Sequence, residues 1–317
     1  MTRTRWIAYV VASVWMIGLA GGCESEPDSA ALSASAQPHY VVTLPVLASI
    51  VEPVVEDRAT TRTVLRAGDS PHTFEPRPSM VRDVRESHAL LYGADVLDGW
   101  AAQMDAPRAY ALLDLVPESH VHSFPDEEEP AEESPGAVTD EGAHDHGAGT
   151  TDPHFWLDPV AVRALVPALA DTLCTADPEG CDTYQTNAQA LTDSLQALHD
   201  ELETVLAPVR DRAFMASQPF LHYFVRRYGL SQVAVVETSP AHEPSAQRIH
   251  QLTQRAQADH VRAMVYQRQL PATAGQAVAE GAGLPMVALD PLAGSDTDTY
   301  MALMRRNAYT LREALEE

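Results

Sequence analysis

Three residues in this sequence have the types and settings of metal ligands. His72 lies in Gly-Asp-Ser-Pro-His-Thr-Phe-Glu-Pro, shortly after a predicted strand, and His154 lies in the proline-containing stretch Asp-Pro-His-Phe-Trp-Leu-Asp-Pro. Asp290 ends another predicted strand, in Leu-Asp-Pro-Leu. Loops at the carboxyl ends of strands carry the binding sites of α/β sheets. Two imidazoles and a carboxylate that converge there suit a first-row transition metal.

A catalytic metal is the main alternative to a binding site. An enzyme would need an open metal position and a nearby general base, for which Glu75 and Glu243 are candidates because they lie near His72 and His242 in the sequence. Neither glutamate lies in a His-Glu-X-X-His motif, and the sequence shows no nucleophile elbow or phosphate-binding loop. Taken alone, a loop histidine is usually solvated, and an aspartate before proline usually serves a turn. The combined pattern favours binding without catalysis.

The elements that must position these residues alternate between strand and helix. Apolar runs predict strands at 40–44, 64–65, 89–92, 214–217, 233–236, 263–266 and 286–289, and helices at 45–55 and 78–87. This alternation predicts parallel sheets with helices on both faces. From Tyr184 to Val205 the apolar residues recur at a spacing of four and three, which predicts one long helix that ends at Pro208. The predicted fold is α/β, with two parallel-sheet lobes joined by one long helix.

The chain divides into five predicted parts. These are a signal peptide at 1–22, a tether at 23–38, an N-terminal α/β lobe at 39–180, a linking helix at 181–208 and a C-terminal α/β lobe at 209–317. The length allows two domains of ordinary size with their own cores, which excludes a small scaffold that depends on disulfides.

The first residues predict export. Arg3 and Arg5 precede an apolar run at 6–20, which is too short for a confident membrane span, and small residues then lead to Cys23. This arrangement resembles the lipobox at which bacterial lipoproteins are cleaved and acylated on the new N-terminal cysteine. We expect a lipid-anchored protein that faces the periplasm or cell exterior. The alternative is an ordinary secreted protein in which Cys23 has no role.

Charge and cysteine content restrict the partners. The chain carries 21 basic and 45 acidic residues, a formal net charge of −24, and such a surface repels nucleic acid. We expect a monomer with no nucleic-acid partner. Cys174 and Cys181 flank a turn-forming stretch, and an exported compartment permits a disulfide there. A metal-binding cysteine pair would need a second cysteine or histidine pair at short spacing, and none is nearby.

An acidic, histidine-bearing segment at 117–150 interrupts the strand and helix rhythm. It contains the run Asp-Glu-Glu-Glu at 126–129 and cannot bury enough apolar surface to offset its ordering entropy. We expect a mobile loop. Its histidines either collect metal weakly near the main site or only help to keep the loop soluble; they are His120, His122, His144 and His146.

The order of these motifs resembles that of the ZnuA-like family, the zinc- and manganese-binding substrate-binding proteins of ABC importers. The resemblance covers residues 39–317 and includes a Tyr-Phe-X3-Tyr-Gly element that starts at Tyr223. It implies two lobes bridged by a rigid helix, with a metal, Zn²⁺ first, in the cleft between them. It also implies delivery to a permease with its ATPase. The alternatives are Mn²⁺ or Fe²⁺ import and metal sequestration by an adhesin-like surface lipoprotein.

The resemblance also implies a ligand set. It comprises His72, His154, Asp290 and a histidine before the Tyr-Phe element. This chain has Gln218 at that last position and a histidine four residues later, His222. If the helix starts at Pro219, His222 projects to nearly the same side as position 218. We therefore expect His222 as the third ligand, with Gln218 as the alternative. Three imidazoles and a carboxylate suit Zn²⁺, whereas an amide oxygen shifts the preference toward Mn²⁺ or Fe²⁺.

Overall fold

The computed structural model describes residues 37–124, 150–237, 243–293 and 299–316. The predicted signal peptide, Cys23, His144 and His146 lie outside these ranges, as do nearly all of the tether and most of the acidic loop.

The first half of the described chain contains a parallel four-stranded sheet in the order β2-β1-β3-β4. Its strands are β1 (His39–Val42), β2 (Thr60–Thr63), β3 (Ala89–Tyr92) and β4 (Ala109–Ala111), and its helices include α1 (Pro45–Val55), α2 (Pro78–Glu86) and the single turn α3 (Asp95–Asp98). The bounds of α1 and β3 match the prediction. The second strand was predicted at 64–65 but lies at 60–63, because the polar residues of β2 pair along a partly exposed sheet edge.

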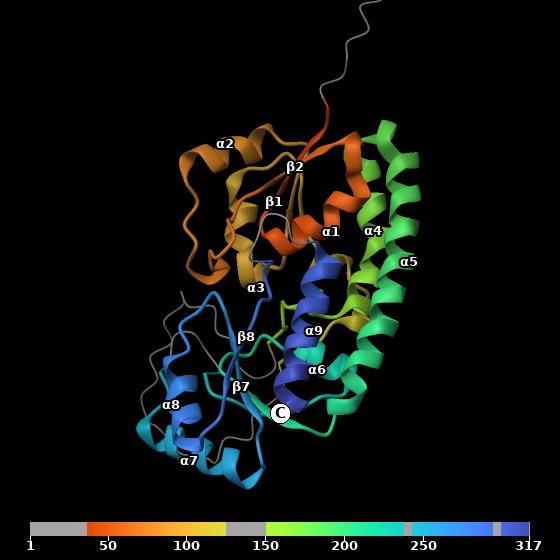
Figure 1. Ribbon diagram of the computed structural model, residues 1–317. Helices are drawn as coiled ribbons and strands as arrows, with labels where there is room; N and C mark the ends of the chain where they lie inside the picture. Colours follow the sequence, from red (N-terminus) through yellow and green to blue (C-terminus); the bar gives the residue numbers. More distant parts are fainter. Residues whose placement is uncertain (1–36, 125–149, 238–242, 294–298, 317) are drawn as a thin grey trace, which may run out of the picture. The chain divides into compact units, whose positions relative to one another are not determined.

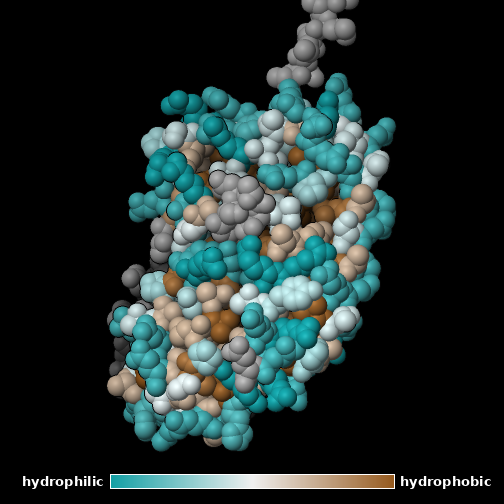
Figure 2. Space-filling model, viewed as in Figure 1, coloured by the Kyte–Doolittle hydropathy of each residue, from teal (hydrophilic) through white to brown (hydrophobic). Residues whose placement is uncertain are grey.

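The second half repeats the same strand order, β6-β5-β7-β8, again with every pair parallel. Its strands are β5 (Ala213–Ala216), β6 (Ser231–Val235), β7 (Ala263–Gln267) and β8 (Met286–Leu289), and its helices are α6 (His222–Tyr228), α7 (Ala246–Ala258), α8 (Thr273–Ala282) and α9 (Tyr300–Glu316). On the face shown in Figure 2, apolar residues gather over β7 and the edge strand β8, whereas hydrophilic residues cover α2.

Two long helices, α4 (Pro159–Ala176) and α5 (Cys181–Leu206), connect the sheets and pack against each other (Figure 1). The seven apolar positions predicted for one face of α5 are all buried. They pack toward α1, α4 and α9, so one helix contacts elements of both halves. Among the described residues only α4 is long and apolar enough to cross a membrane, and half of it is buried inside the protein. These features confirm the α/β fold with two parallel-sheet lobes and a long helix; the exact lobe boundaries stay a prediction.

The turn between α4 and α5 is closed by a disulfide between Cys174 and Cys181. Beside it, the Asp177 carboxylate accepts hydrogen bonds from the Arg58 guanidinium, at 2.7 Å from Nε, and from the Tyr184 hydroxyl, also at 2.7 Å. Arg58 is the leading cause of a lowered pKa at Asp177, which keeps that carboxylate ionised. This network ties the start of α5 to the short helical turn Glu56–Arg58, just before β2.

We expect reduction of the disulfide to lower the free energy of unfolding by about 2–3 kcal/mol, because the short loop that it closes regains entropy in the unfolded chain. The melting temperature should fall by roughly 5 °C. Thermal unfolding with and without reductant measures this loss. The Cys174→Ala/Cys181→Ala variant is the control, since reductant should not lower its melting temperature further. Equal shifts in both proteins would contradict the expectation.

Candidate metal centre

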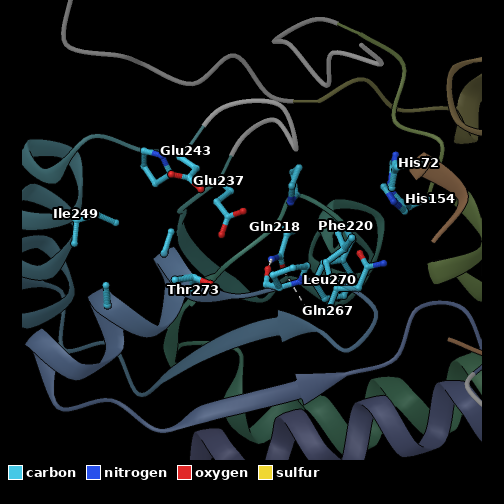
Figure 3. A pocket seen from close by; sticks show the side chains of 15 residues that line it. His72, His154, Gln218, Phe220, Glu237, Glu243, Ile249, Gln267, Leu270 and Thr273 are labelled. Atoms are coloured by element: carbon cyan, nitrogen blue, oxygen red, sulfur yellow. Dashed lines mark hydrogen bonds between the residues drawn. The ribbon is translucent and has the colours of Figure 1, made fainter. Parts of the chain in front are cut away.

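His72 and His154 line one pocket of about 490 Å³ (Figure 3). The second half of the chain supplies its other polar lining residues, which are Gln218, Glu237, Glu243, Gln267 and Thr273. Several apolar side chains complete the wall, among them Phe220, Ile249 and Leu270. Gln218 follows β5 and Gln267 ends β7. This places the pocket at the carboxyl ends of the two central strands of the second sheet, where α/β folds bind ligands.

A short helical turn, Pro71–Thr73, presents His72. Gly68 lies just before it with a φ of +93°, a conformation that favours glycine and lets the chain reverse after β2. The Trp100 ring packs on Phe74 with centroids 5.1 Å apart, and its indole nitrogen donates to the Pro71 carbonyl at 3.4 Å. Trp100 thus contacts both Pro71 and Phe74, the residues on either side of His72 and Thr73. The position of His72 therefore depends on its neighbours in the first lobe.

The fully buried carboxylate of Asp152 positions His154. Its Oδ1 accepts from the His154 backbone nitrogen at 2.9 Å and lies 2.7 Å from the ring nitrogen Nδ1. Burial alone would raise the pKa of Asp152, but the charge and hydrogen bonds of His154, and then His222, outweigh it and lower the pKa. The carboxylate is therefore an anion that holds Nδ1–H. Nε2 is then the nitrogen with which His154 would bind a metal.

The segment that carries His154 is anchored to the second half of the chain at two further residues. The Trp156 indole donates to the Pro291 carbonyl at 2.9 Å, and the Tyr300 hydroxyl donates to the Trp156 carbonyl at 2.7 Å. Asp158 accepts from Nε of Arg227 in α6 at 2.7 Å and also caps α4 through the Val160 nitrogen at 2.8 Å. Residues beyond α5 therefore supply hydrogen-bond partners for Trp156 and Asp158, which stabilise this conformation of the segment 152–158.

Gln218 lines the pocket, but both ends of its amide are occupied by backbone hydrogen bonds. Nε2 donates to the Pro271 carbonyl at 2.8 Å, and Oε1 accepts from the Gln267 nitrogen at 3.2 Å. The residue is buried, at 5% exposure. Its side chain links the end of β5 to the end of β7 and to the turn before α8. Gln218 thus has a structural role whether or not its oxygen also binds a metal.

His222 is not among the residues that line this pocket. We expected His222 to take the place of position 218 if a helix started at Pro219. That condition was wrong, because α6 begins at His222. Residues 219–221 are not helical, so positions 218 and 222 are not one helical turn apart. The His222 ring instead lies with Nδ1 3.5 Å from Oδ2 of Asp152 and with its centroid 6.0 Å from that of His122.

Asp290 is also absent from the pocket lining and is only 2% exposed. Its Oδ1 accepts from Nε2 of Gln269 at 2.7 Å and from the Leu292 nitrogen at 3.0 Å. Asn307 of α9 exchanges two hydrogen bonds with the Asp290 backbone, at 2.7 and 3.0 Å. Asp290 directly follows β8 and precedes Pro291, whose carbonyl accepts the hydrogen bond from the Trp156 indole. It therefore lies close to the His154 segment, with hydrogen bonds that fix its orientation.

Glu237, the second residue after β6, lines the pocket although it was not predicted from the sequence. Its place at the carboxyl end of a strand was the available signal, but no motif surrounds it. Burial raises the pKa of Glu237, and the nearby Glu243 adds to the effect, while the Ser217 hydroxyl, 3.4 Å away, opposes it. Glu243 itself lines the pocket, whereas Glu75 is exposed and does not. Two carboxylates therefore accompany the two imidazoles around this cavity.

The described loop histidines lie outside the pocket lining. His120 ends a short helical turn, Glu118–His120. The His122 backbone nitrogen donates to the Tyr223 hydroxyl at 3.0 Å, and the two rings are 4.8 Å apart. Burial lowers the pKa of His122, and the Arg226 charge lowers it further. Within the described ranges, no three histidine, cysteine or acidic side chains are already close enough to hold one metal ion.

The zinc-uptake complex component A (periplasmic) family model, named ZnuA, matches residues 41–314. The chain belongs to this family. The match spans both sheets and the helices between them, so the two-lobed fold and the motif order are those of a ZnuA-like protein. The family is named for a component of metal uptake and not for an enzyme, in agreement with the prediction of binding without catalysis.

Individual relatives agree with the family. The zinc-binding lipoprotein AdcA of Streptococcus pneumoniae serotype 4 is 27% identical over 274 residues, which cover 83% of this chain but only 53% of AdcA. The ZnuA protein of Paracoccus denitrificans, a high-affinity zinc uptake protein, is 30% identical over 240 residues, 70% of this chain and 73% of that protein. This chain therefore spans about half the length of AdcA.

A solved structure confirms the fold. The substrate-binding protein FpvC of Pseudomonas aeruginosa in complex with Mn²⁺ superposes with a TM-score of 0.72 at 21% identity, covering 88% of this chain and 99% of FpvC.

We expect Gln218→Ala to lower the free energy of unfolding by about 2–3 kcal/mol in the presence of a chelator, because the buried Gln267 N–H loses its acceptor and the Pro271 C=O loses its donor. Urea denaturation measures the loss. Gln254→Ala is the matched control, since this exposed glutamine of α7 bonds the neighbouring His250 side chain, and the loss in this variant should stay within about 0.5 kcal/mol. Similar small losses in both variants would show that the Gln218 amide does not hold the strands together.

Proposed function

We propose that this protein captures a divalent transition metal, Zn²⁺ first, and binds it in the pocket through His72 and His154. The observation that carries the proposal is that two separate loops of the first lobe present an imidazole to one cavity at the strand ends of the second lobe. The Asp152 contact supports it, because a carboxylate on Nδ1 orients a histidine for metal binding through Nε2.

The remaining ligands are part of the same proposal. Asp290 is the proposed carboxylate ligand, and its hydrogen bonds to Gln269 and Leu292 would fix the direction of its oxygens. The fourth ligand is His222 or Gln218 according to the sequence. The pocket lining favours Gln218, whose amide oxygen would have to accept a metal in addition to the Gln267 N–H.

The number of imidazoles bears on the choice of metal. Two histidines, a carboxylate and an amide oxygen suit Mn²⁺ or Fe²⁺ better than a site with three histidines does, and FpvC, which shares the fold, was solved with Mn²⁺. Zinc remains the first choice because the relatives AdcA and ZnuA are named for zinc. Mn²⁺ or Fe²⁺ is the second candidate.

We further propose that the protein is exported, is anchored by a lipid on Cys23 and delivers its metal to an ABC permease with its ATPase as a monomer. The family name supports a place in an uptake complex outside the cytoplasm, and the AdcA name supports the lipid anchor. Neighbouring genes for an ATPase and a multi-span permease would favour import over the alternative, a metal-sequestering surface lipoprotein.

We expect metal to stabilise the folded protein, because its ligands converge only in the native state. At free zinc about a thousand times the dissociation constant, linkage gives about 4 kcal/mol, or on the order of 10 °C in melting temperature. Thermal unfolding with zinc, manganese or ferrous iron measures the shift. His72→Ala and His154→Ala should abolish it, whereas His120→Ala, outside the pocket, should not. No shift with any of the three metals would overturn the proposed function.

We expect the acidic loop to be dispensable for tight binding. The residues on either side of 125–149 pair in antiparallel fashion, and the Phe124 nitrogen donates to the Thr150 carbonyl at 2.9 Å. A two-residue Asn-Gly turn can therefore replace residues 125–149. Zinc titration should then show one tight site of unchanged affinity and fewer weakly bound ions. A Gly/Ser loop of the original length is the control. Loss of the tight site in both variants would place a main ligand in the loop.

A further inference from the structure

The two oxygens of the Asp152 carboxylate face two different histidines. Oδ1 holds the backbone and ring of His154, as described above. Oδ2 faces Nδ1 of His222 at 3.5 Å, which is long for a hydrogen bond, and both atoms are shielded from solvent with no other hydrogen-bond partner among the described residues. A buried carboxylate oxygen without a donor is costly, and the facing imidazole nitrogen can supply one after a small approach.

The position of His222 relative to His154 argues against a shared metal. Nδ1 of His154 points at Asp152, so a metal on Nε2 would lie on the far side of the ring. His222 approaches the same carboxylate from the other oxygen and packs beside His122. It is thus separated from the metal position by the carboxylate and the His154 ring, and it does not line the pocket.

Helix α6 holds the His154 segment at two points. His222, its first residue, lies against Asp152, and Arg227 forms a salt bridge to Asp158 with Nη2 2.7 Å from Oδ2. The two aspartates flank His154 in the sequence. A helix of the second lobe therefore contacts the loop of the first lobe on both sides of the metal-binding histidine.

We propose that His222 is a positioning residue that holds the Asp152 carboxylate, and through it the His154 imidazole, and is not itself a metal ligand. This inference rests on the proposed function in so far as His154 binds the metal. According to this proposal, His222 affects metal affinity indirectly, through its contact with Asp152.

Different substitutions of His222 can distinguish a positioning residue, which acts through Nδ1, from a metal ligand. Asparagine places its amide NH2 close to the position of the imidazole Nδ1, whereas glutamine reaches the position of Nε2. If His222 holds Asp152 through Nδ1, His222→Asn should keep zinc affinity within about threefold of the native protein. His222→Ala and His222→Gln should then weaken zinc binding by about tenfold, the range typical of groups that orient a ligand. A competing chelator dye measures the affinities, and His72→Ala shows the loss expected for a true ligand.

A double-mutant cycle tests the route through Asp152. In the Asp152→Ala background, His222→Ala should have no further effect on zinc affinity, because the carboxylate that transmits it is gone. Three results would overturn the inference. In the first, His222→Asn binds zinc as poorly as His222→Ala, and both losses are near that of His72→Ala. In the second, His222→Ala does not change zinc affinity, and in the third its effect persists in the Asp152→Ala background.

A metal-free measurement keeps this test separate from the proposed function. In the chelator-treated protein, ¹⁵N NMR of the imidazoles should place the His154 ring proton on Nδ1, in a slowly exchanging signal. His222→Ala should shift that signal and His222→Asn should largely restore it. A proton on Nε2 of His154, or a signal that ignores His222, would overturn the inference. Failure of the native protein to bind zinc, manganese or ferrous iron would instead refute the proposed function.

Discussion

The conformation of residues 152–158 is the constraint on which the rest of the metal centre depends. Asp152, Trp156 and Asp158 are buried, and each carries a polar group that must find a partner inside the protein. The partners of Trp156 and Asp158 lie beyond the linking helix, in the Pro291 carbonyl and the Arg227 guanidinium of the second lobe. Removing a partner would leave a buried carboxylate or indole N–H unsatisfied, so the segment and the second lobe specify each other.

This mutual dependence explains why the long helix matters for binding. Since α5 packs against α1, α4 and α9, it fixes the distance over which segment 152–158 must reach its partners. The second sheet then contributes to the centre through its strand ends, where Gln218 joins β5 to β7 and Asn307 holds the backbone of Asp290. The two pocket histidines, His72 and His154, are thus carried by one lobe, and the segment around His154 is held partly by the other.

The sequence predicted those features that local pattern determines. The helix 45–55, the buried strand 89–92 and the apolar face of α5 follow from periodicity, and the motifs around His72 and His154 identified two residues of the pocket. Prediction from the sequence failed where the structure depends on tertiary hydrogen bonds and not on local pattern. Helix α6 starts at His222, and Gln218 is bonded instead to residues 267 and 271, tertiary contacts that no spacing rule reveals. Glu237 enters the pocket only because β6 lies beside β5.

Gln218 also bears on how the site would choose its metal. Where the resemblance implies a third imidazole, this chain has an amide whose two polar atoms already connect backbone groups of the second lobe. An amide is a weak ligand for zinc, so a preference for zinc would have to come from the fixed directions of the two imidazoles and a carboxylate. Those directions are set by buried hydrogen bonds, at Asp152 for His154 and at Gln269 and Leu292 for Asp290. At the proposed site, metal selectivity would therefore depend on the groups that orient the ligands as much as on the ligands themselves.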